Sequence, residues 1–193
     1  MKKTIIAVSI ALGLAGIGIS VALIAYKPTR VLWPEVVGLK RTIGDVYVDN
    51  ARNSLQAAKL LDASIEEISR KGFFFKKLPR ILLCFYQRTY ELLGFKKSAA
   101  RTVDGLAIVL GPNGIQGFYL KHELIHYWQH ENLGWFYAKH YPAWFVEGMA
   151  YSLSDDPRHP IAQPWESYRA RFEAWYATNS NILEESSKLY CRL

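Results

Sequence analysis

The apolar positions of the chain fall into one long uncharged run followed by shorter, periodic segments. The run covers residues 4–25, and at about 1.5 Å per residue a helix of that length spans a hydrocarbon core of about 30 Å. It is longer than the apolar part of a secretory signal peptide, which usually holds about 7–15 residues. We therefore expect residues 1–26 to form an uncleaved N-terminal membrane anchor, a transmembrane helix, with a cleaved signal peptide as the alternative.

The charges that flank this run leave its orientation open. Lys2 and Lys3 precede it, and Lys27, Arg30 and further basic residues follow it, so the positive-inside rule does not decide between the two orientations. A two-lysine tip directly before an apolar run is typical of an export signal. We expect a single-pass membrane protein whose folded domain lies in the periplasm or outside the cell, joined to the anchor by a linker at residues 27–42.

The periodic segments predict an α+β domain over residues 43–193. A helix that ends near Gly72 is predicted by apolar residues recurring at spacings of three and four, namely Ala58, Leu61, Ile65 and Ile68. Short apolar runs and turn residues predict the remaining elements. These are strands at 43–48, 81–86 and 105–110 and helices at 118–131, 142–153 and 164–175.

Composition restricts the class of protein. Of 193 residues, 50% are hydrophobic, 14% are aromatic and 21% are charged, so the part after the anchor can bury a core of its own. This composition excludes a disordered chain, a collagen-like repeat and a disulfide-stapled miniprotein. The chain has only two cysteines, Cys84 and Cys191, which could pair if the domain is exported. We expect one globular domain after the anchor.

The residues that carry chemistry begin at His122-Glu123-Leu124-Ile125-His126, an HExxH sequence. On a helix, positions four apart are separated by about 400°, so both imidazoles project from one face and can bind one metal ion. A catalytic zinc ion takes three protein ligands and one water. Glu147 follows His126 after twenty intervening residues, on the predicted helix 142–153, and is the best candidate for the third ligand. For the HExxH sequence alone, an ordinary helix surface is the alternative.

HExxH followed by Trp144-x-x-Glu147-Gly148-x-Ala150 resembles the gluzincin zinc metallopeptidases, which include thermolysin-like and M1-aminopeptidase-like enzymes. The resemblance covers residues 104–156. It implies a zincin-like domain with a small sheet and an HExxH active-site helix. It further implies that His122, His126 and Glu147 bind Zn²⁺, that Glu123 is the general base, and that strand 105–110 is the sheet edge on which an extended substrate lies. The number of residues between His126 and Glu147 differs from that in both subgroups, so the chain is assigned to neither.

Other polar residues are weaker candidates for the site. Asp155 is either a carboxylate that orients a ligating histidine or a residue that ends its helix. We expect His130 and His140 to lie outside the metal site. The group that stabilises the oxyanion stays open among Tyr151, His159, Tyr168 and Tyr176.

Basic residues and aromatic residues each form one dense group. Nine lysines and arginines lie between Arg70 and Arg101, against the single acid Glu91. We interpret this block as a solvated face, with contact to anionic lipid as the alternative; no nucleic-acid motif is present, so no nucleic-acid partner is expected. The aromatic residues between 135 and 145 are expected to pack in the core between the two metal-bearing helices, with the wall of a substrate pocket as the alternative.

Together these patterns predict a membrane-anchored zinc peptidase. Zinc lowers the pKa of a bound water to about 7, so Glu123 can accept its proton during attack on a peptide carbonyl. The partners are then a peptide or protein substrate and the membrane. One alternative is a zinc amidohydrolase that acts on a non-protein amide. Another is a non-catalytic membrane-tethered binding or assembly protein with a structural metal site.

Overall fold

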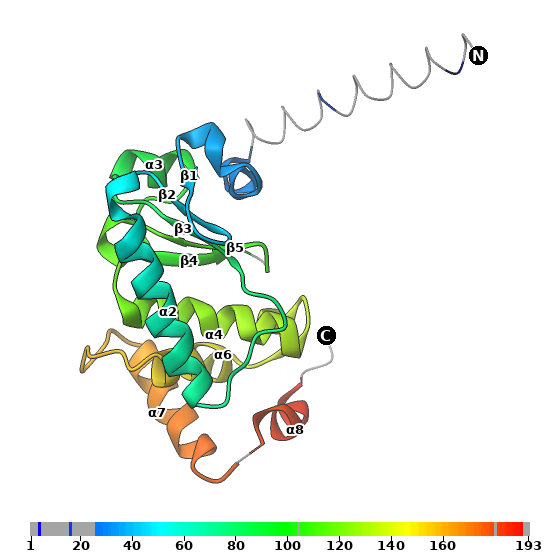
Figure 1. Ribbon diagram of the computed structural model, residues 1–193. Coiled ribbons are helices and arrows are strands. Elements are labelled where there is room, and N and C mark those ends of the chain that lie inside the picture. The colour runs from blue at the N-terminus through cyan, green and yellow to red at the C-terminus, as the bar shows by residue number, and fades with distance from the viewer. Residues whose placement is uncertain (1–3, 5–15, 17–25, 104, 180, 191–193) are drawn as a thin grey trace.

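The computed structural model describes residues 26–103, 105–179 and 181–190, together with Thr4 and Gly16 (Figure 1). Nearly all of the predicted anchor, and Cys191 of the predicted disulfide, lie outside these residues. Within the described ranges, no helix combines the length and the apolar character needed to cross a membrane. The membrane anchor and the disulfide therefore stay predictions.

The domain is built on a mixed five-stranded sheet in the order β1-β2-β3-β5-β4. The three central strands are parallel, and the edge strands β1 and β4 run antiparallel to their neighbours. The strands are β1 (Lys40–Arg41), β2 (Val46–Val48), β3 (Arg80–Leu83), β4 (Ala100–Val103) and β5 (Ala107–Leu110). Ile81, Leu82 and Leu83 of β3 are fully buried, because side chains on both faces of a central parallel strand are covered.

Helices cover both faces of the sheet, and a third layer packs behind them (Figure 1). One face carries α2 (Ser54–Arg70) and α4 (Gly117–Leu133). The other carries the 3₁₀ helices η1 (Lys27–Leu32) and η2 (Pro34–Val37) with α3 (Gln87–Leu92). On the side of α4 away from the sheet lie α6 (Ala143–Leu153) and α7 (Trp165–Tyr176). The shorter helices are η3 (Ala51–Asn53), η4 (Pro112–Gly114), α5 (Tyr137–His140), α8 (Ile182–Ser186) and η5 (Ser187–Leu189).

Helix α4 lies between two hydrophobic cores. Leu120 and Leu124 pack towards the sheet and α2, whereas Ile125 and Trp128 pack towards α6 and α7. A helix surrounded in this way needs apolar residues on several sides rather than on one stripe. The HExxH sequence is therefore held in the middle of the domain, with one of its faces left for the site.

The α+β class and the four longer helices are confirmed. The buried positions of α2 are Ala57, Leu61, Ser64 and Ile68, so the core-facing stripe is turned slightly from the predicted one. Ser64 is tolerated there because its hydroxyl donates to the carbonyl oxygen of Leu60 at 2.7 Å. The three predicted strands exist but are shorter than expected.

The prediction that strand 105–110 forms the sheet edge is wrong. This strand is β5, and it pairs with β3 on one side and β4 on the other. The edge is β4, which sequence patterns did not reveal because Ala100–Val103 includes Arg101 and Thr102 and forms no apolar run.

Residues 27–42 are part of the domain, not the linker that we expected. Val31 and Leu39 are buried in the core on the η1 and η2 face of the sheet. The guanidinium of Arg80 on β3 also donates to the carbonyl oxygens of Val31 and Leu32. The prolines that suggested a linker open the two short 3₁₀ helices instead.

The aromatic residues between α4 and α6 are only partly in the core. Tyr141, Trp144 and Phe145 are buried as expected, but Trp135 and Phe136 are 62% and 57% exposed. The buried aromatic residues of this group therefore start at Tyr141.

Candidate metal centre

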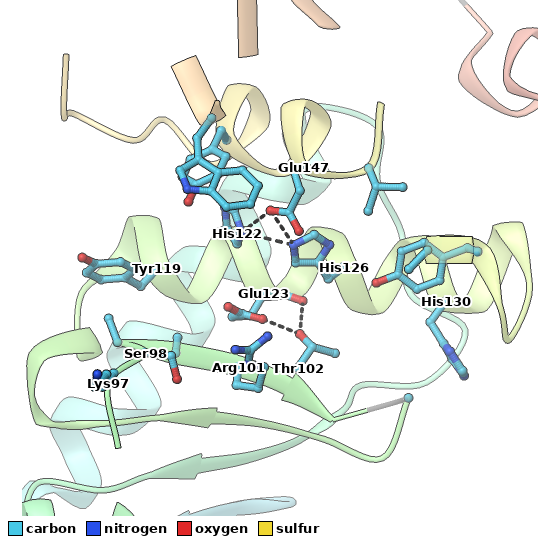
Figure 2. Close-up of a pocket in the computed structure, with 18 of the residues that line it drawn as sticks. Lys97, Ser98, Arg101, Thr102, Tyr119, His122, Glu123, His126, His130 and Glu147 are labelled. Atoms are coloured by element: carbon cyan, nitrogen blue, oxygen red, sulfur yellow. Dashed lines mark hydrogen bonds and ion pairs between the residues drawn. The ribbon is translucent and has the colours of Figure 1, made fainter. Parts of the chain in front are cut away.

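Two histidines of α4 and one glutamate of α6 converge on one point (Figure 2). The Nε2 atoms of His122 and His126 lie 3.1 Å apart. Oε2 of Glu147 lies 3.8 Å from the first and 3.7 Å from the second. The structure therefore brings together the three residues that sequence spacing selected.

These three atoms have the spacing of ligands around a single ion. A point equidistant from them lies about 2.1 Å from each, which matches the distances of about 2.0–2.2 Å that imidazole nitrogens and carboxylate oxygens keep from zinc. Within the described residues, this is the one cluster of three or more histidine, cysteine or acidic side chains that could hold a metal ion.

Gln129 fixes the orientation of the second histidine. Its side-chain NH₂ donates to the carbonyl oxygen of Val146 at 2.9 Å, so its Oε1 faces Nδ1 of His126, also at 2.9 Å. An amide oxygen only accepts hydrogen bonds, so Nδ1 must carry the proton. In the neutral imidazole this leaves the lone pair on Nε2, the atom that faces His122 and Glu147.

Burial and charge shift the pKa values of all three residues. Burial, reinforced by His126, lowers the pKa of His122 to about 3. Burial also disfavours the charged form of His126, but Glu147 outweighs this and raises its pKa. Burial opposes ionisation of Glu147 as well, yet the adjacent His126 lowers its pKa. The arrangement keeps the imidazole of His122 neutral and favours the carboxylate form of Glu147, the forms that bind a metal ion.

Glu123 faces the edge strand rather than the ligand cluster. The single proton of the Thr102 hydroxyl on β4 is shared between the carboxylate Oε2 of Glu123, at 2.7 Å, and the main-chain oxygen of Glu123, at 3.0 Å (Figure 2). Burial raises the pKa of this carboxyl, which is 8% exposed. The hydroxyl and the main-chain amide of Thr102 both favour the ionised carboxylate, but burial outweighs them.

The cluster opens into a cleft of about 600 Å³. One wall is the edge strand β4 and the segment before it, and the opposite wall is formed by α4 and α6. The lining includes His122, Glu123, His126 and Glu147, so the site is accessible from outside the domain.

Of the four candidates for the group that stabilises the oxyanion, the structure brings one next to a predicted ligand. The ring of Tyr151 packs edge-on against His122, with centroids 4.5 Å apart, and lines the cleft. Burial, with the nearby Glu147, raises its pKa to about 12, so it is a neutral hydroxyl at neutral pH. His159 instead contacts Arg169, and Tyr168 and Tyr176 pack against Trp165 and Phe172. Tyr151 is the one of the four that touches a predicted ligand.

Asp155 is a helix-end residue and not a partner of a histidine. Its carboxylate forms ion pairs with Lys71 at 2.5 Å and with Lys121 at 2.8 Å. His130 packs on Trp135, and His140 stacks on Tyr190. As expected, neither histidine belongs to the ligand cluster.

Sequence patterns missed two polar residues that contact the site. Gln129 lies three positions after His126 on the same helix, a spacing at which helical side chains meet, so it could have been found. Thr102 could not, because β4 itself was not predicted.

Comparison of the chain with models of known protein families, with curated proteins and with solved structures finds no match.

Proposed function

We propose that this protein is a membrane-anchored zinc peptidase of the gluzincin type. The observation that carries the proposal is the convergence of His122, His126 and Glu147 beside the buried carboxylate of Glu123 in an open cleft. A purely structural zinc site is closed by four protein ligands, whereas a catalytic site has three and keeps one position open.

The donor set suits zinc. Two imidazole nitrogens and one carboxylate are an established ligand set for catalytic zinc. The hydrogen bond from His126 to Gln129 supplies the outer partner that a ligating histidine normally has. When bound, zinc supplies a Lewis acid that polarises a carbonyl and lowers the pKa of a water molecule to about 7.

Glu123 is the proton carrier in this proposal. Thr102 holds the carboxylate in place, and Glu123 lines the cleft, so it can accept a proton from a water molecule there. The raised pKa of the buried carboxyl brings it closer to the neutral range, where a general base can also return its proton to a leaving amine. The neutral hydroxyl of Tyr151, whose ring packs against His122 and lines the cleft, can donate to a developing oxyanion.

An extended peptide fits the wall of the cleft. The outer side of β4 carries no further strand among the described residues, and an exposed sheet edge can bind a peptide through main-chain hydrogen bonds. Because Thr102 and Glu123 lie at this edge, a peptide along β4 would pass its carbonyl groups close to the proposed base. This relation favours a peptide over a non-protein amide.

The membrane part of the proposal rests on the sequence. Residues 4–25 carry no charge, and we place them in the bilayer with the catalytic domain in the periplasm or outside the cell. The domain begins at Lys27, so it would lie close to the membrane surface.

The proposal can be tested on the full chain purified in detergent. Zinc content after dialysis against a weak chelator and cleavage of a mixed peptide library would be measured for wild type, Glu123→Gln and Glu147→Ala. We expect about one zinc per chain and cleavage for wild type, zinc without cleavage for Glu123→Gln, and loss of both for Glu147→Ala. Glu173→Ala, an exposed glutamate on α7, is the matched control.

Any other outcome would contradict a specific part of the proposal. Full cleavage by Glu123→Gln would remove Glu123 as the base. Zinc retained by Glu147→Ala would remove Glu147 as an essential ligand. Bound zinc without cleavage of any peptide would favour an amidohydrolase or a non-catalytic assembly protein.

A further inference from the structure

Basic side chains line the strand side of the cleft. Figure 2 shows Lys97, Ser98 and Tyr119 at one end and His130 at the other, with His122 and His126 between them. The lysine and arginine side chains that line the cleft are Lys97 and Arg101, from the segment before β4 and from β4 itself, and Arg158 from the loop after α6. Figure 2 shows Arg101 beside Thr102, on the strand side of the cleft and facing the helix that carries both histidines. The uncharged residues Tyr137, Ala138 and Val146 also line the cleft.

Two of these cations make no hydrogen bond or ion pair with a described residue, although Arg101 lies close enough to Glu123 and Glu147 for its charge to oppose the rise that burial causes in their pKa values. Arg158 forms an ion pair with the buried Asp156 and donates to the Tyr119 hydroxyl at 3.0 Å. Lys97 and Arg101, by contrast, are exposed and make no hydrogen bond or ion pair with any described residue. Their charges are therefore available to a ligand in the cleft.

The acidic side chains in the cleft would be offset by a bound zinc ion rather than by these cations. The only acids among its described lining residues are Glu123 and Glu147. Glu147 belongs to the proposed metal site, and the two charges of a zinc ion would offset both carboxylates. Lys97 and Arg101 then leave the cleft with an excess of positive charge next to the proposed reacting centre.

We propose that the strand side of the cleft, at Arg101 and Lys97, binds a carboxylate of the substrate, so that the enzyme prefers acidic peptides. Arg101 is the main contact, because a guanidinium matches a carboxylate with two parallel hydrogen bonds, and Lys97 adds attraction. The inference rests on the proposed peptidase function and names the substrate class of the same site. The carboxylate can come from an aspartate or glutamate side chain or from the C-terminus of the peptide.

Peptide pairs distinguish these two sources. In the first series, the two peptides of each pair have amidated C-termini and differ only in having glutamate or glutamine at one position. That position is varied over the three residues on each side of the cleaved bond. In the second comparison, two peptides share one neutral sequence and differ only in having a free or an amidated C-terminus. We expect kcat/KM to be about tenfold higher, or more, for the acidic member of one pair, as a charge-assisted hydrogen bond implies. Preference in the first series assigns the side chain, and preference in the second comparison assigns the C-terminus.

The role of Arg101 is tested by the ratio of kcat/KM for the acidic and the neutral member. We expect Arg101→Gln to bring this ratio close to one and Arg101→Glu to invert it, with a smaller effect for Lys97→Gln. Arg88→Gln is the matched control, because Arg88 is exposed on α3, on the other face of the sheet. Equal rates for acidic and neutral peptides in wild type, or a ratio unaffected by Arg101→Gln, would overturn the inference.

Binding separates this inference from the proposed chemistry. The dissociation constants of the same peptides, labelled with a fluorophore, would be measured by anisotropy on zinc-loaded Glu123→Gln and on Glu123→Gln with Arg101→Gln. Tighter binding of acidic peptides that depends on Arg101, without cleavage of any peptide by wild type, would support the carboxylate site and contradict the peptidase. Cleavage without any acidic preference would support the peptidase and contradict the carboxylate site.

Discussion

Oε1 of Gln129 lies 2.9 Å from Nδ1 of His126. The side-chain NH₂ of the same glutamine donates to the carbonyl oxygen of Val146, the residue before Glu147. One fully buried side chain thus connects a proposed ligand on α4 with the helix that carries another.

Replacing this glutamine should weaken metal binding without unfolding the domain. Gln129→Met keeps the length of the side chain but removes the acceptor for His126, and loss of such a partner typically lowers metal affinity about 10- to 100-fold. Competition with a chromophoric chelator would measure the zinc affinity, and circular dichroism would check the fold. Gln56→Met, at an exposed position of α2, is the control. Unchanged affinity in Gln129→Met would show that Gln129 does not hold the ligand.

Thr102→Val should slow the reaction while metal stays bound. Valine has nearly the shape of threonine but cannot donate to the Glu123 carboxylate, and a hydrogen bond to a charged group contributes about 1.5–3 kcal/mol. We expect kcat to fall about tenfold or more, with zinc content unchanged. Thr178→Val removes a hydroxyl at the end of α7 and should have no effect. A wild-type kcat for Thr102→Val would mean that Glu123 needs no support from β4.

The ion pair of Asp156 and Arg158 should make stability depend on pH. Burial disfavours the charged form of Asp156, but hydrogen bonds from Arg158 outweigh it and hold the pKa of this carboxyl below its usual range. A carboxyl with a lower pKa in the folded state stabilises the fold above its unfolded pKa of about 3.9. That contribution is lost as the pH falls through the folded pKa.

Asp156→Asn therefore should lower the free energy of unfolding by about 1.5–3 kcal/mol at pH 7 and by less near pH 3. Urea denaturation of both proteins at the two pH values measures the difference. A loss of the same size at both values would assign the effect to packing instead of charge.

Gly148 is required by the close contact of α6 and α7. A Cβ at this position would lie 2.3 Å from the carbonyl oxygen of Tyr168 and 2.8 Å from Cβ of Phe172. We expect Gly148→Ala to destabilise the domain by about 1–3 kcal/mol and, because Glu147 is adjacent, to reduce zinc affinity. Thermal unfolding and zinc titration test both effects. Gly117→Ala is the control, since a Cβ there meets nothing within 4 Å.

The sequence predicted those parts of the site that depend on local spacing. His122 and His126 share a helix, and Glu147 lies on a second strongly apolar helix, so periodicity was sufficient to place all three. The edge strand was missed because Arg101 and Thr102 interrupt its pattern, and strand pairing joins residues that are distant in sequence. Residues 27–42 were misassigned for a similar reason: Val31 is buried only because β3 and its neighbours are there to cover it.

Lys121, the residue before His122, is 5% exposed and forms ion pairs with Glu67 of α2 and with Asp155 just after α6. These contacts lie on a different side of α4 from the cleft, and they resist rotation of the helix about its own axis. The direction in which both imidazoles point is thus set partly by ion pairs that lie outside the substrate cleft. Substitutions at Glu67 or Asp155, on the surface of the domain, would then change the alignment of the histidines through the helix itself.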